Sequence, residues 1–388
     1  MRVADDPDTA ANLGRQHRFL TYEPGLDGLR GIAIAGVLCF HAFAASGIDL
    51  VRGGYLGVSL FFTLSGFLIT SLLLRERAST GGNDLRRFWA RRIRRLAPAS
   101  LVVVVVVIAL SGPWTVLHAR TSDAVAATWS VTNWHIIAAG QDAILQTVVG
   151  PLGPTWSLAV EEQFYVGLVV LVVLAMATRT PRRVLAVVCA IGWVVPMLLT
   201  NLVTDWHPTL EFATVMRAPE LFAGVALALW TTSDRPPRWS AGRGDVAAGV
   251  GLVVLIGMML LVDYDPPWQL RGGYGLIALV SAATILGTVA RGRVGTALGN
   301  RPLVALGLVS YSLYLVHWPV ILILDEQRTG LHRWSLALVR IAVAVVAAIV
   351  LHVVVERPIR RMRTPWWPTF AAWLAACAGV TVAAVALL

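Results

Sequence analysis

Repeated apolar runs of about 20 residues constrain this chain more than any other feature of its sequence. A helix of that length crosses the hydrocarbon core of a bilayer, because each residue adds about 1.5 Å to its length. With 57% hydrophobic and 14% charged residues, the 388-residue chain also lacks the polar surface of a soluble domain. The sequence therefore predicts an all-α, polytopic transmembrane helix bundle with about 11 spans. The predicted spans are 29–47, 55–74, 97–117, 156–177, 184–203, 216–231, 245–262, 272–290, 303–324, 334–355 and 367–387.

The placement of arginine predicts the orientation of this bundle. All 32 basic residues are arginines. If the N-terminus is cytoplasmic and the spans alternate, 25 arginines fall in cytoplasmic segments and 7 lie at or near the outer side. This is the positive-inside bias of membrane proteins. It predicts a multi-pass protein of the plasma membrane with the N-terminus in the cytoplasm and the C-terminus outside, and it explains the net charge of +10 without a nucleic-acid partner.

Besides its spans, the chain has a polar N-terminal stretch and one long loop. The polar stretch 1–25 lacks the pattern of a cleavable signal peptide, so we expect a cytoplasmic tail there and a single domain over 26–388. The loop 118–155 contains an apolar stretch with Trp129 and Trp134, which predicts a re-entrant or interfacial helix.

The three cysteines each lie in a different apolar run, at Cys39, Cys189 and Cys377. This distribution favours small buried side chains over a disulfide framework or a metal site.

The stretch LDGLRGIAIAGVLCFH, residues 26–41, carries two ionisable side chains into the first span. Eleven residues separate Arg30 from His41. At 100° per residue this spacing places both on one helix face, about 16 Å apart along the axis. An ionisable group in a membrane is a candidate functional residue. The alternative is a histidine that only hydrogen-bonds to a neighbouring helix.

The segment FWARRIRRLAP, residues 88–98, places Arg92 and Arg95 three residues apart on one helix face. Arginine binds phosphate through two parallel hydrogen bonds. The positive-inside rule and anionic lipid head groups explain the same residues without a specific ligand.

Adjacent carboxylates stand in the segment PTWSLAVEEQFYV, residues 154–166. Glu161 and Glu162 point about 100° apart on a helix, so they do not act as a stacked pair. We expect one to face the bundle interior and the other an interfacial partner. Because a carboxylate inside a span is costly, we also expect a functional role or an arginine partner.

Two further polar motifs lie in apolar runs. In RAPELFAG, Arg217 and Glu220 are three residues apart, which is the spacing of an ion pair on one helix. In SYSLYLVHWP, Ser310, Tyr314 and His317 lie near one helix face. Such residues either form interhelical hydrogen bonds or line a polar cavity. The motif ERPIRR, which begins at 356, closes the tenth span and is explained by an anchoring role.

Together, and in this order, these motifs resemble those of the acyltransferase family 3 membrane proteins, which O-acylate carbohydrates and some antibiotic sugars. The resemblance covers most of the chain through LDGLRGIAI, GGYLGVSLFFTLSGFLI, FWARRIRRLAP, PTWSLAVEEQFY, RAPELFAG, SYSLYLVHWP and ERP. Each motif alone is weak, whereas seven in register are specific. The family's Arg-x10-His motif falls on Arg30 and His41, and its Arg-x-x-Arg motif falls on Arg92 and Arg95.

The resemblance implies an acyl-CoA donor, usually acetyl-CoA, and a hydroxyl acceptor on a carbohydrate or on a glycosylated or lipid-linked molecule. It implies no permanently bound cofactor and no metal, and the chain resembles the stand-alone form without a C-terminal esterase-like domain. Partners are then acyl-CoA, the acceptor and membrane lipids, and the sequence does not give the oligomeric state.

A site hypothesis follows from the resemblance and from the chemistry of acyl transfer. Histidine is the side chain that serves as a base near neutral pH, so His41 is the expected base. The expected roles are catalytic for His41, Glu161 and Glu162, donor-binding for Arg30, Arg92 and Arg95, and substrate-binding for Arg217, Glu220, Tyr311, Tyr314 and His317. An acyl-enzyme on Ser65 or another serine is an open alternative, although nothing in the sequence marks a nucleophile.

A polytopic transporter of a polar or lipid-linked substrate is the main rival, because polar groups within the spans suit a carrier as well. The ordered motif set and the lack of an apparent inverted repeat argue against it. A non-catalytic membrane scaffold would leave His41 without a role.

Overall fold

All the regular structure in the described residues is helical. The structure is a computed structural model that describes residues 22–139, 150–202, 211–233, 239–264 and 268–388. Within them, nine helices are long and apolar enough to cross a membrane, and a bent pair makes a tenth. The nine candidates are α2 (Pro24–Ala44), Gly54–Thr80 with α3 (Gly57–Thr80), α4 (Leu85–Ser111), α7 (Thr155–Met176), α8 (Pro181–Leu202), α10 (Ala241–Leu261), Gln269–Val289 with α12 (Tyr274–Val289), Arg333–Arg361 with α17 (Arg333–Leu351), and α19 (Trp366–Leu387).

Every predicted span coincides with a helix, but two of them are not straight, full-length spans. The run at 303–324 consists of α14 (Arg301–Leu308) and α15 (Ser310–Ile323), which meet at an angle of 69°. The run at 216–231 is α9 (Ala218–Thr231), a helix of only 14 residues. The polytopic helical bundle is confirmed, while apolar length alone did not distinguish these two irregular segments from ordinary spans.

Shorter elements fill the connections. They are η1 (Gly54–Leu56), η2 (Thr115–Leu117), α5 (Thr121–Thr128), η4 (Gln269–Gly273), α13 (Arg293–Leu298), α16 (Glu326–Thr329), η5 (His352–Glu356) and α18 (Arg357–Arg361). In the predicted interfacial segment, α5 is followed by helical backbone over 132–139. The helical character expected around Trp129 and Trp134 is therefore present, and the indole groups donate to Thr381 and Gln163. The predicted tail falls largely on residues 1–21, which lie outside the described residues.

The basic segment 75–95 lies between two predicted spans, and most of it is helical. α3 continues to Thr80, and α4 begins at Leu85 and runs through the arginines into the apolar span as one 27-residue helix. The Asp84 carboxylate caps the start of α4 by accepting a hydrogen bond from the Arg87 backbone N–H at 3.0 Å. Arginine is a good helix former, so nothing ends the helix before the apolar run begins.

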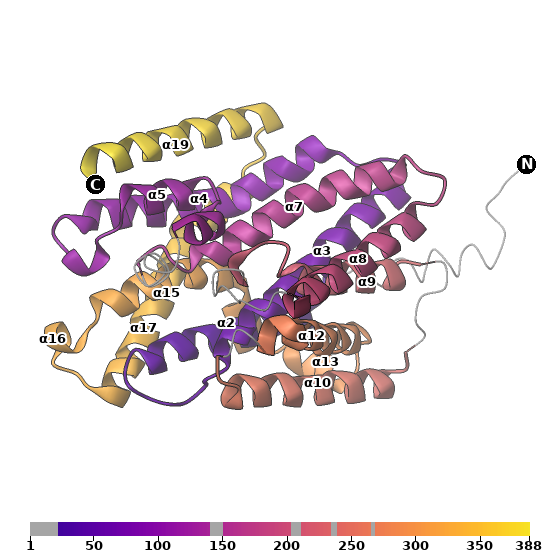
Figure 1. Ribbon diagram of the computed structural model, residues 1–388, viewed down its shortest axis with the longest axis horizontal. Coiled ribbons are helices and arrows are strands. Elements are labelled where there is room, and N and C mark those ends of the chain that lie inside the picture. The colour runs from indigo at the N-terminus through magenta and orange to yellow at the C-terminus, as the bar shows by residue number, and fades with distance from the viewer. Residues whose placement is uncertain (1–21, 140–149, 203–210, 234–238, 265–267) are drawn as a thin grey trace, which may run out of the picture.

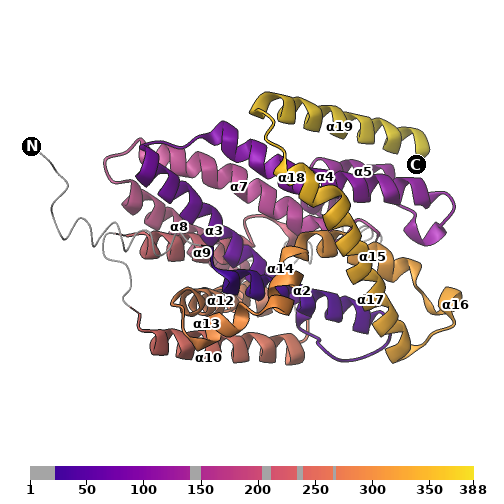
Figure 2. The same ribbon diagram turned by 180° about the vertical axis from the view of Figure 1, so that it is seen from behind.

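The helices run mainly along the long axis of the molecule (Figures 1 and 2). The α3–α4 and α7–α8 turns lie at one end, and α16 and the C-terminal end of α19 lie at the other. This arrangement fits the predicted alternation of the spans. Which end faces the cytoplasm stays a prediction.

Several helix pairs approach so closely that only glycine fits between them, and two of these crossings position α9 and α14. A Cβ atom on Gly66 of α3 would lie 2.1 Å from the Leu221 carbonyl oxygen of α9, and one on Gly224 would lie 2.1 Å from the Thr63 carbonyl oxygen. At the crossing of α2 and α14, a Cβ atom on Gly307 would lie 1.9 Å from the Asp27 carbonyl oxygen. Small residues at such crossings are typical of membrane helices. These contacts fix α9 and α14 against the helices that carry the candidate site residues.

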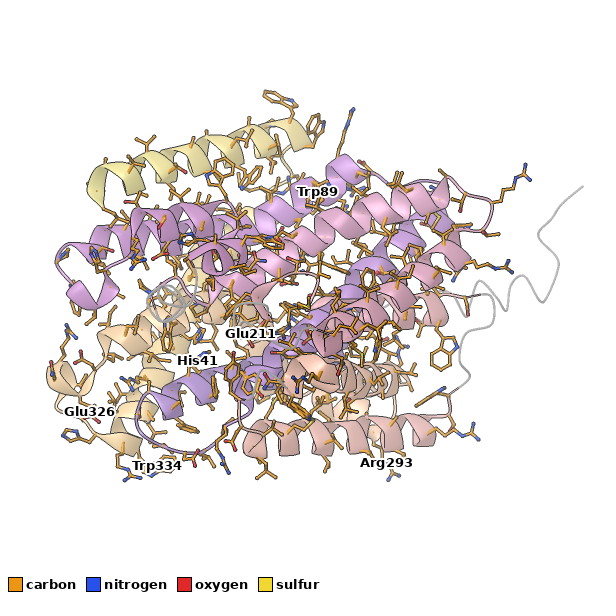
Figure 3. The ribbon with its side chains drawn as sticks, viewed as in Figure 1. His41, Trp89, Glu211, Arg293, Glu326 and Trp334 are labelled. Carbon is orange, nitrogen blue, oxygen red and sulfur yellow. The ribbon has the colours of Figure 1, made fainter. Side chains whose placement is uncertain are left out.

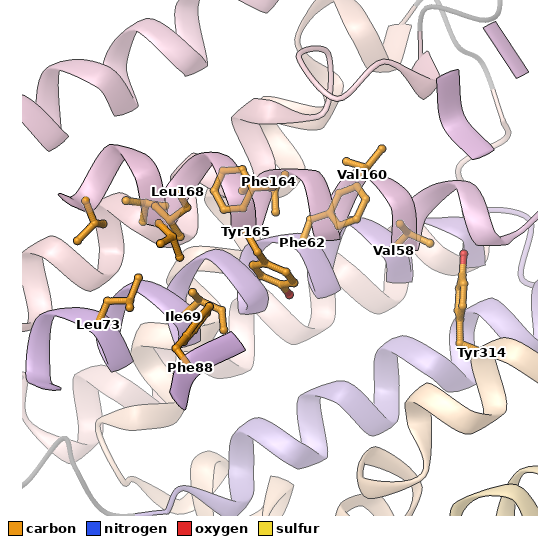
Figure 4. Packing of buried hydrophobic residues seen from close by; sticks show 14 of the residues in the cluster. Val58, Phe62, Ile69, Leu73, Phe88, Val160, Phe164, Tyr165, Leu168 and Tyr314 are labelled. Carbon is orange, nitrogen blue, oxygen red and sulfur yellow. The ribbon is translucent and has the colours of Figure 1, made fainter. Parts of the chain in front are cut away.

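The core between α3, α4 and α7 surrounds the site. Figure 4 shows Phe62, Tyr165 and Phe164 packed between α3 and α7, with Tyr314 of α15 approaching from the other side. Phe62 and Tyr165 are almost fully buried. This packing holds the polar side chains described next in fixed positions.

Candidate active site

The shared face of Arg30 and His41 packs against α15. The Arg30 Nη2 atom donates to the Ser310 hydroxyl at 3.1 Å. Near the other end of α2, His41 Nδ1 lies 3.2 Å from His317 Nε2. The prediction that the two residues share one face is confirmed, and the contacts that each makes with another helix here both come from the SYSLYLVHWP motif.

The two histidines form a buried pair. His317 is fully buried, whereas His41 retains some accessible surface. His41 Nδ1 also lies 3.1 Å from the Val37 carbonyl oxygen, and His317 Nδ1 lies 2.7 Å from the Tyr314 carbonyl oxygen. The ring of His41 packs against Phe40 and Trp318, with centroids 5.0 and 5.2 Å away. Figure 3 shows His41 within the bundle, near the end of α2.

A cavity of about 90 Å³ lies between α2, α3, α4, α7 and α15. It brings together three arginines, one carboxylate and several hydroxyl groups from these helices. The polar lining residues are Arg30, Ser65, Arg92, Arg95, Ser157, Glu161, Tyr165, Ser310, Tyr311 and Tyr314. A water molecule needs roughly 10–15 Å³ of such space, so the cavity is large enough for several waters or a small organic group.

Arg92 is already paired within this region. Its guanidinium lies 3.7 Å from a Glu161 oxygen and 3.6 Å from a Glu162 oxygen. It also stacks over the Tyr165 ring, 3.3 Å from the ring centroid. Glu161 lines the cavity and accepts hydrogen bonds from Ser65 and Tyr165. Arg92 therefore bridges both carboxylates, and its charge is balanced by the protein.

Arg95 differs from Arg92 although it lies on the same helix face. Among the residues that the structure describes, no side chain forms an ion pair or hydrogen bond with Arg95, and its side chain lines the cavity. Arg30 is intermediate, because its guanidinium lies 3.7 Å from Asp27 and also bonds to Ser310. The cavity therefore holds positive charge that the surrounding protein only partly balances.

Arg217 and Glu220 form a closed ion pair. Arg217 donates from Nε to Glu220 Oε2 at 2.6 Å and from Nη2 to Oε1 at 2.8 Å. Its guanidinium carbon also lies 3.8 Å from the centroid of the Tyr274 ring. Glu220 is fully buried. The predicted ion pair is present, and it occupies both oxygens of the carboxylate.

The two predicted tyrosines line the cavity and link helices. The Tyr311 hydroxyl donates to the Leu96 carbonyl oxygen at 2.8 Å. The Tyr314 hydroxyl lies 2.6 Å from the Ser157 hydroxyl and donates to the Pro154 carbonyl oxygen at 3.0 Å. Because the Tyr314 carbonyl also contacts His317, this residue connects the cavity with the histidine pair.

The predicted residues thus divide into separate groups. Glu161 and Glu162 lie with Arg92, and neither contacts His41 among the described residues. Sequence reasoning did not single out Tyr165, although its position four residues after Glu161 in the motif EEQFY was a usable signal. It also did not foresee that His317 would contact His41, because that contact depends on the packing of two distant helices.

Glu211 is a further buried carboxyl that sequence reasoning did not identify. It is 3% exposed and accepts a hydrogen bond from the Tyr264 hydroxyl. Burial raises the pKa of Glu211 to about 7. It lies before α9 on the chain, on the side of the Arg217–Glu220 pair, and it does not line the arginine cavity.

Comparison with known proteins gives a match over nearly the whole chain. A family model described as an acyltransferase domain matches residues 23–388. Two Staphylococcus aureus proteins named O-acetyltransferase OatA, from strains NCTC 8325 / PS 47 and COL, are each 31% identical to the chain over 358 residues, which is 88% of this chain and 57% of each relative. A protein of S. aureus strain MSSA476 that is provisionally named an O-acetyltransferase is 34% identical over 323 residues, which is 79% of this chain and 52% of the relative.

The chain spans about half the length of the curated relatives it matches. No solved structure matches the chain significantly.

Proposed function

The chain belongs to the acyltransferase 3 family, and on this basis we propose that it is a membrane O-acyltransferase. It moves an acyl group, in the simplest case acetyl, from acyl-CoA to a hydroxyl group of a carbohydrate or of a glycosylated or lipid-linked acceptor. His41 is the general base. The observation that carries the proposal is the cavity inside the bundle, with three arginines and a histidine pair adjoining it through Tyr314.

The arginines support an anionic donor. Arg95 has no protein partner among the described residues, and it faces the cavity beside Arg30 and Arg92. The phosphates of coenzyme A would complete the pairing of this cation through charge-assisted hydrogen bonds. In this proposal Arg95 is the main contact of the donor, and Arg30 adds to it. Arg92 orients Glu161 and Glu162.

The size of the cavity limits how the donor binds. A volume of about 90 Å³ accepts a narrow chain or a short acyl group but not a whole coenzyme A. In this proposal the nucleotide stays outside the cavity, and the pantetheine arm extends from the arginines toward Tyr314, the cavity residue that contacts His317 of the histidine pair. The small volume favours a short acyl group such as acetyl.

The proposed reaction needs one proton transfer at His41. The neutral imidazole takes the proton of the acceptor hydroxyl while the oxygen of that hydroxyl attacks the thioester carbonyl carbon. The carbon–sulfur bond then breaks, and the thiolate of coenzyme A receives the proton from His41. The surrounding apolar core limits the access of water, which would otherwise hydrolyse the thioester.

Orientation is part of the same proposal. With the N-terminus and the α3–α4 turn in the cytoplasm, the donor reaches the arginines from the side where acyl-CoA is made. The C-terminal end of α19 then lies outside. Single cysteines introduced at Ser79 and Glu326 in a background without the native cysteines would test this by impermeant labelling in intact cells. External labelling at Ser79 would contradict the orientation.

The central experiment uses the purified full-length chain with labelled acetyl-CoA and a panel of oligosaccharides and glycolipids. We expect label to appear in the acceptor with the wild type. His41→Gln should fold normally and bind acetyl-CoA, but transfer roughly 10²–10⁴-fold more slowly, which is the usual contribution of a general base. A less stable His41→Gln variant whose folded fraction transfers at the normal rate would make His41 a structural residue.

The transporter alternative is favoured by one observation, the broken span of α14 and α15, because carriers often build their sites at discontinuous helices. Proteoliposomes without acyl-CoA distinguish the two functions. Uptake of an unmodified acceptor into these vesicles, together with no acyl transfer in the assay above, would favour transport.

A further inference from the structure

We propose that His317 is a positioning residue that fixes the tautomer of His41, so that the Nε2 atom of His41 is the basic nitrogen. This inference deepens the proposed function and rests on its assignment of His41 as the base.

The proton on His317 is determined by its own backbone. The Tyr314 carbonyl oxygen, 2.7 Å from His317 Nδ1, can only accept a hydrogen bond. Nδ1 of His317 must therefore carry a proton. In a neutral imidazole the other nitrogen then carries a lone pair. Nε2 of His317 is thus an acceptor, and it faces His41.

The position of the proton on His41 follows from its two neighbours, which are both hydrogen-bond acceptors. His41 Nδ1 lies 3.2 Å from His317 Nε2 and 3.1 Å from the Val37 carbonyl oxygen. Both neighbours accept, so Nδ1 must carry the proton. The lone pair of neutral His41 therefore resides on Nε2, on the opposite side of the ring. This is the nitrogen that can take a proton from an acceptor hydroxyl.

His317 is well suited to hold this arrangement. Its side chain is fully buried, and Tyr314, whose carbonyl oxygen accepts a hydrogen bond from His317 Nδ1, is itself fixed by Ser157 and the Pro154 carbonyl oxygen. The Val37 carbonyl alone also favours the Nδ1 proton, but as part of the α2 backbone it lies on the same helix as His41. His317 adds the contact from α15 that fixes the angle of the ring.

Three substitutions at His317 separate positioning from simple packing. The amide of Gln reaches the place of the imidazole Nε2, so His317→Gln can still accept the proton of His41. The amide of Asn reaches only the place of Nδ1, so His317→Asn bonds to the Tyr314 carbonyl but leaves His41 without this acceptor. His317→Leu removes both functions. The Gln and Asn variants carry the same amide group at different distances from the backbone. A difference between their kinetics or spectra therefore reports the effect of the position of that amide.

The expected results combine structure and kinetics. In ¹⁵N-histidine NMR spectra of the purified protein without substrate, His41, one of eight histidines, should show a protonated Nδ1 and an unprotonated Nε2 in the wild type and in His317→Gln. We expect kcat to fall about 10²-fold in His317→Asn and His317→Leu and less than tenfold in His317→Gln, with the KM for acetyl-CoA unchanged in all three. His352→Leu, which removes a half-buried histidine bonded to Glu356, is the matched control and should leave His41 unaffected.

Two results would overturn the inference. One is a wild-type spectrum in which His41 carries its proton on Nε2. The other is a kcat that falls equally in His317→Gln and His317→Asn while the spectrum of His41 stays unchanged in both. The spectrum of the wild type needs neither substrate nor a variant. It therefore tests the tautomer of His41 even if His317→Leu does not fold. Failure of the proposed function appears separately, as normal transfer by His41→Gln.

Discussion

Two buried arginine regions in this molecule differ in how their charge is balanced. Arg217 gives two short hydrogen bonds to one carboxylate and stacks on an aromatic ring, so its region is closed. Around the cavity, Arg92 is shared between two carboxylates, and Arg95 has no protein partner among the described residues. Arg95 is only half-buried, but a charge inside a helix bundle without a partner is still costly, so the open region is the one in which a ligand is expected. The comparison separates arginines that hold the fold from those that are available for binding.

The largest expected effect lies in the closed region. Arg217→Ala should lower the free energy of unfolding by about 3–5 kcal/mol, because it leaves the fully buried Glu220 carboxylate without its cation. Thermal unfolding of the purified protein measures this loss.

The double variant Arg217→Leu with Glu220→Leu is the matched control, because it removes both charges and should recover part of the stability. If acetyl-CoA affinity of the folded fraction falls after Arg217→Ala alone, the distinction between the two regions does not hold.

A second prediction concerns the pH dependence of the closed region. The Glu211 carboxyl, with Tyr264, Tyr274, Arg217 and Glu220 around it, has a pKa raised by burial from 4.5 to about 7. Between these values the folded state keeps a proton that the unfolded state releases, so stability should fall as the pH rises from 4.5 to 7. A pKa shift of this size corresponds to a decrease of about 3 kcal/mol in the free energy of unfolding between pH 4.5 and 7.

Glu211→Gln keeps an acceptor for Tyr264 and should flatten this part of the stability profile. Unfolding midpoints measured at several pH values test it. A profile that keeps its slope in the variant would assign the pH dependence to another group.

The open region should respond in binding rather than in folding. Arg95→Ala should weaken acetyl-CoA binding by roughly 1.5–3 kcal/mol, the usual contribution of a hydrogen bond to a charged group, with little change in unfolding temperature. Arg92→Ala should instead lower stability, because Glu161 and Glu162 lose their shared cation. Calorimetric titration with acetyl-CoA and thermal unfolding separate the two.

Arg94→Ala is the control for loss of positive charge from the same helix, since Arg94 bonds to Thr364 and Thr369 and does not line the cavity. Equal donor affinity in Arg95→Ala and Arg94→Ala would remove Arg95 from the donor site.

The smallest effect concerns the acyl chain. A cavity of about 90 Å³ favours acetyl over longer acyl groups, and each additional methylene that must be forced into it reduces the rate. Rates with acetyl-, butyryl- and octanoyl-CoA measure this preference. Faster transfer of the octanoyl group would mean that the acyl chain binds elsewhere.

Sequence reasoning reached as far as a single helix allows. The spacing of Arg30 and His41 gave their common face, because helix geometry is local. The Arg-x-x-Arg motif gave the right helix face but not the difference between Arg92 and Arg95, since that difference comes from carboxylates on α7. The contact of His41 with His317 joins residues 276 positions apart and depends on how α2 and α15 pack. Hydropathy located α15 but not its break from α14, because the two helices together pass as one apolar span.

The glycine crossings have a consequence for the route by which an acceptor reaches the interior. At Gly66 and Gly224 the backbones of α3 and α9 touch, and the same is true of α2 and α14 at Gly307. Parting either pair would open a seam lined by backbone and forfeit packing that no lipid chain restores. Under the proposed function, we therefore expect a membrane-borne acceptor to avoid these crossings and to enter between helices that meet through side chains, which can rotate out of its path.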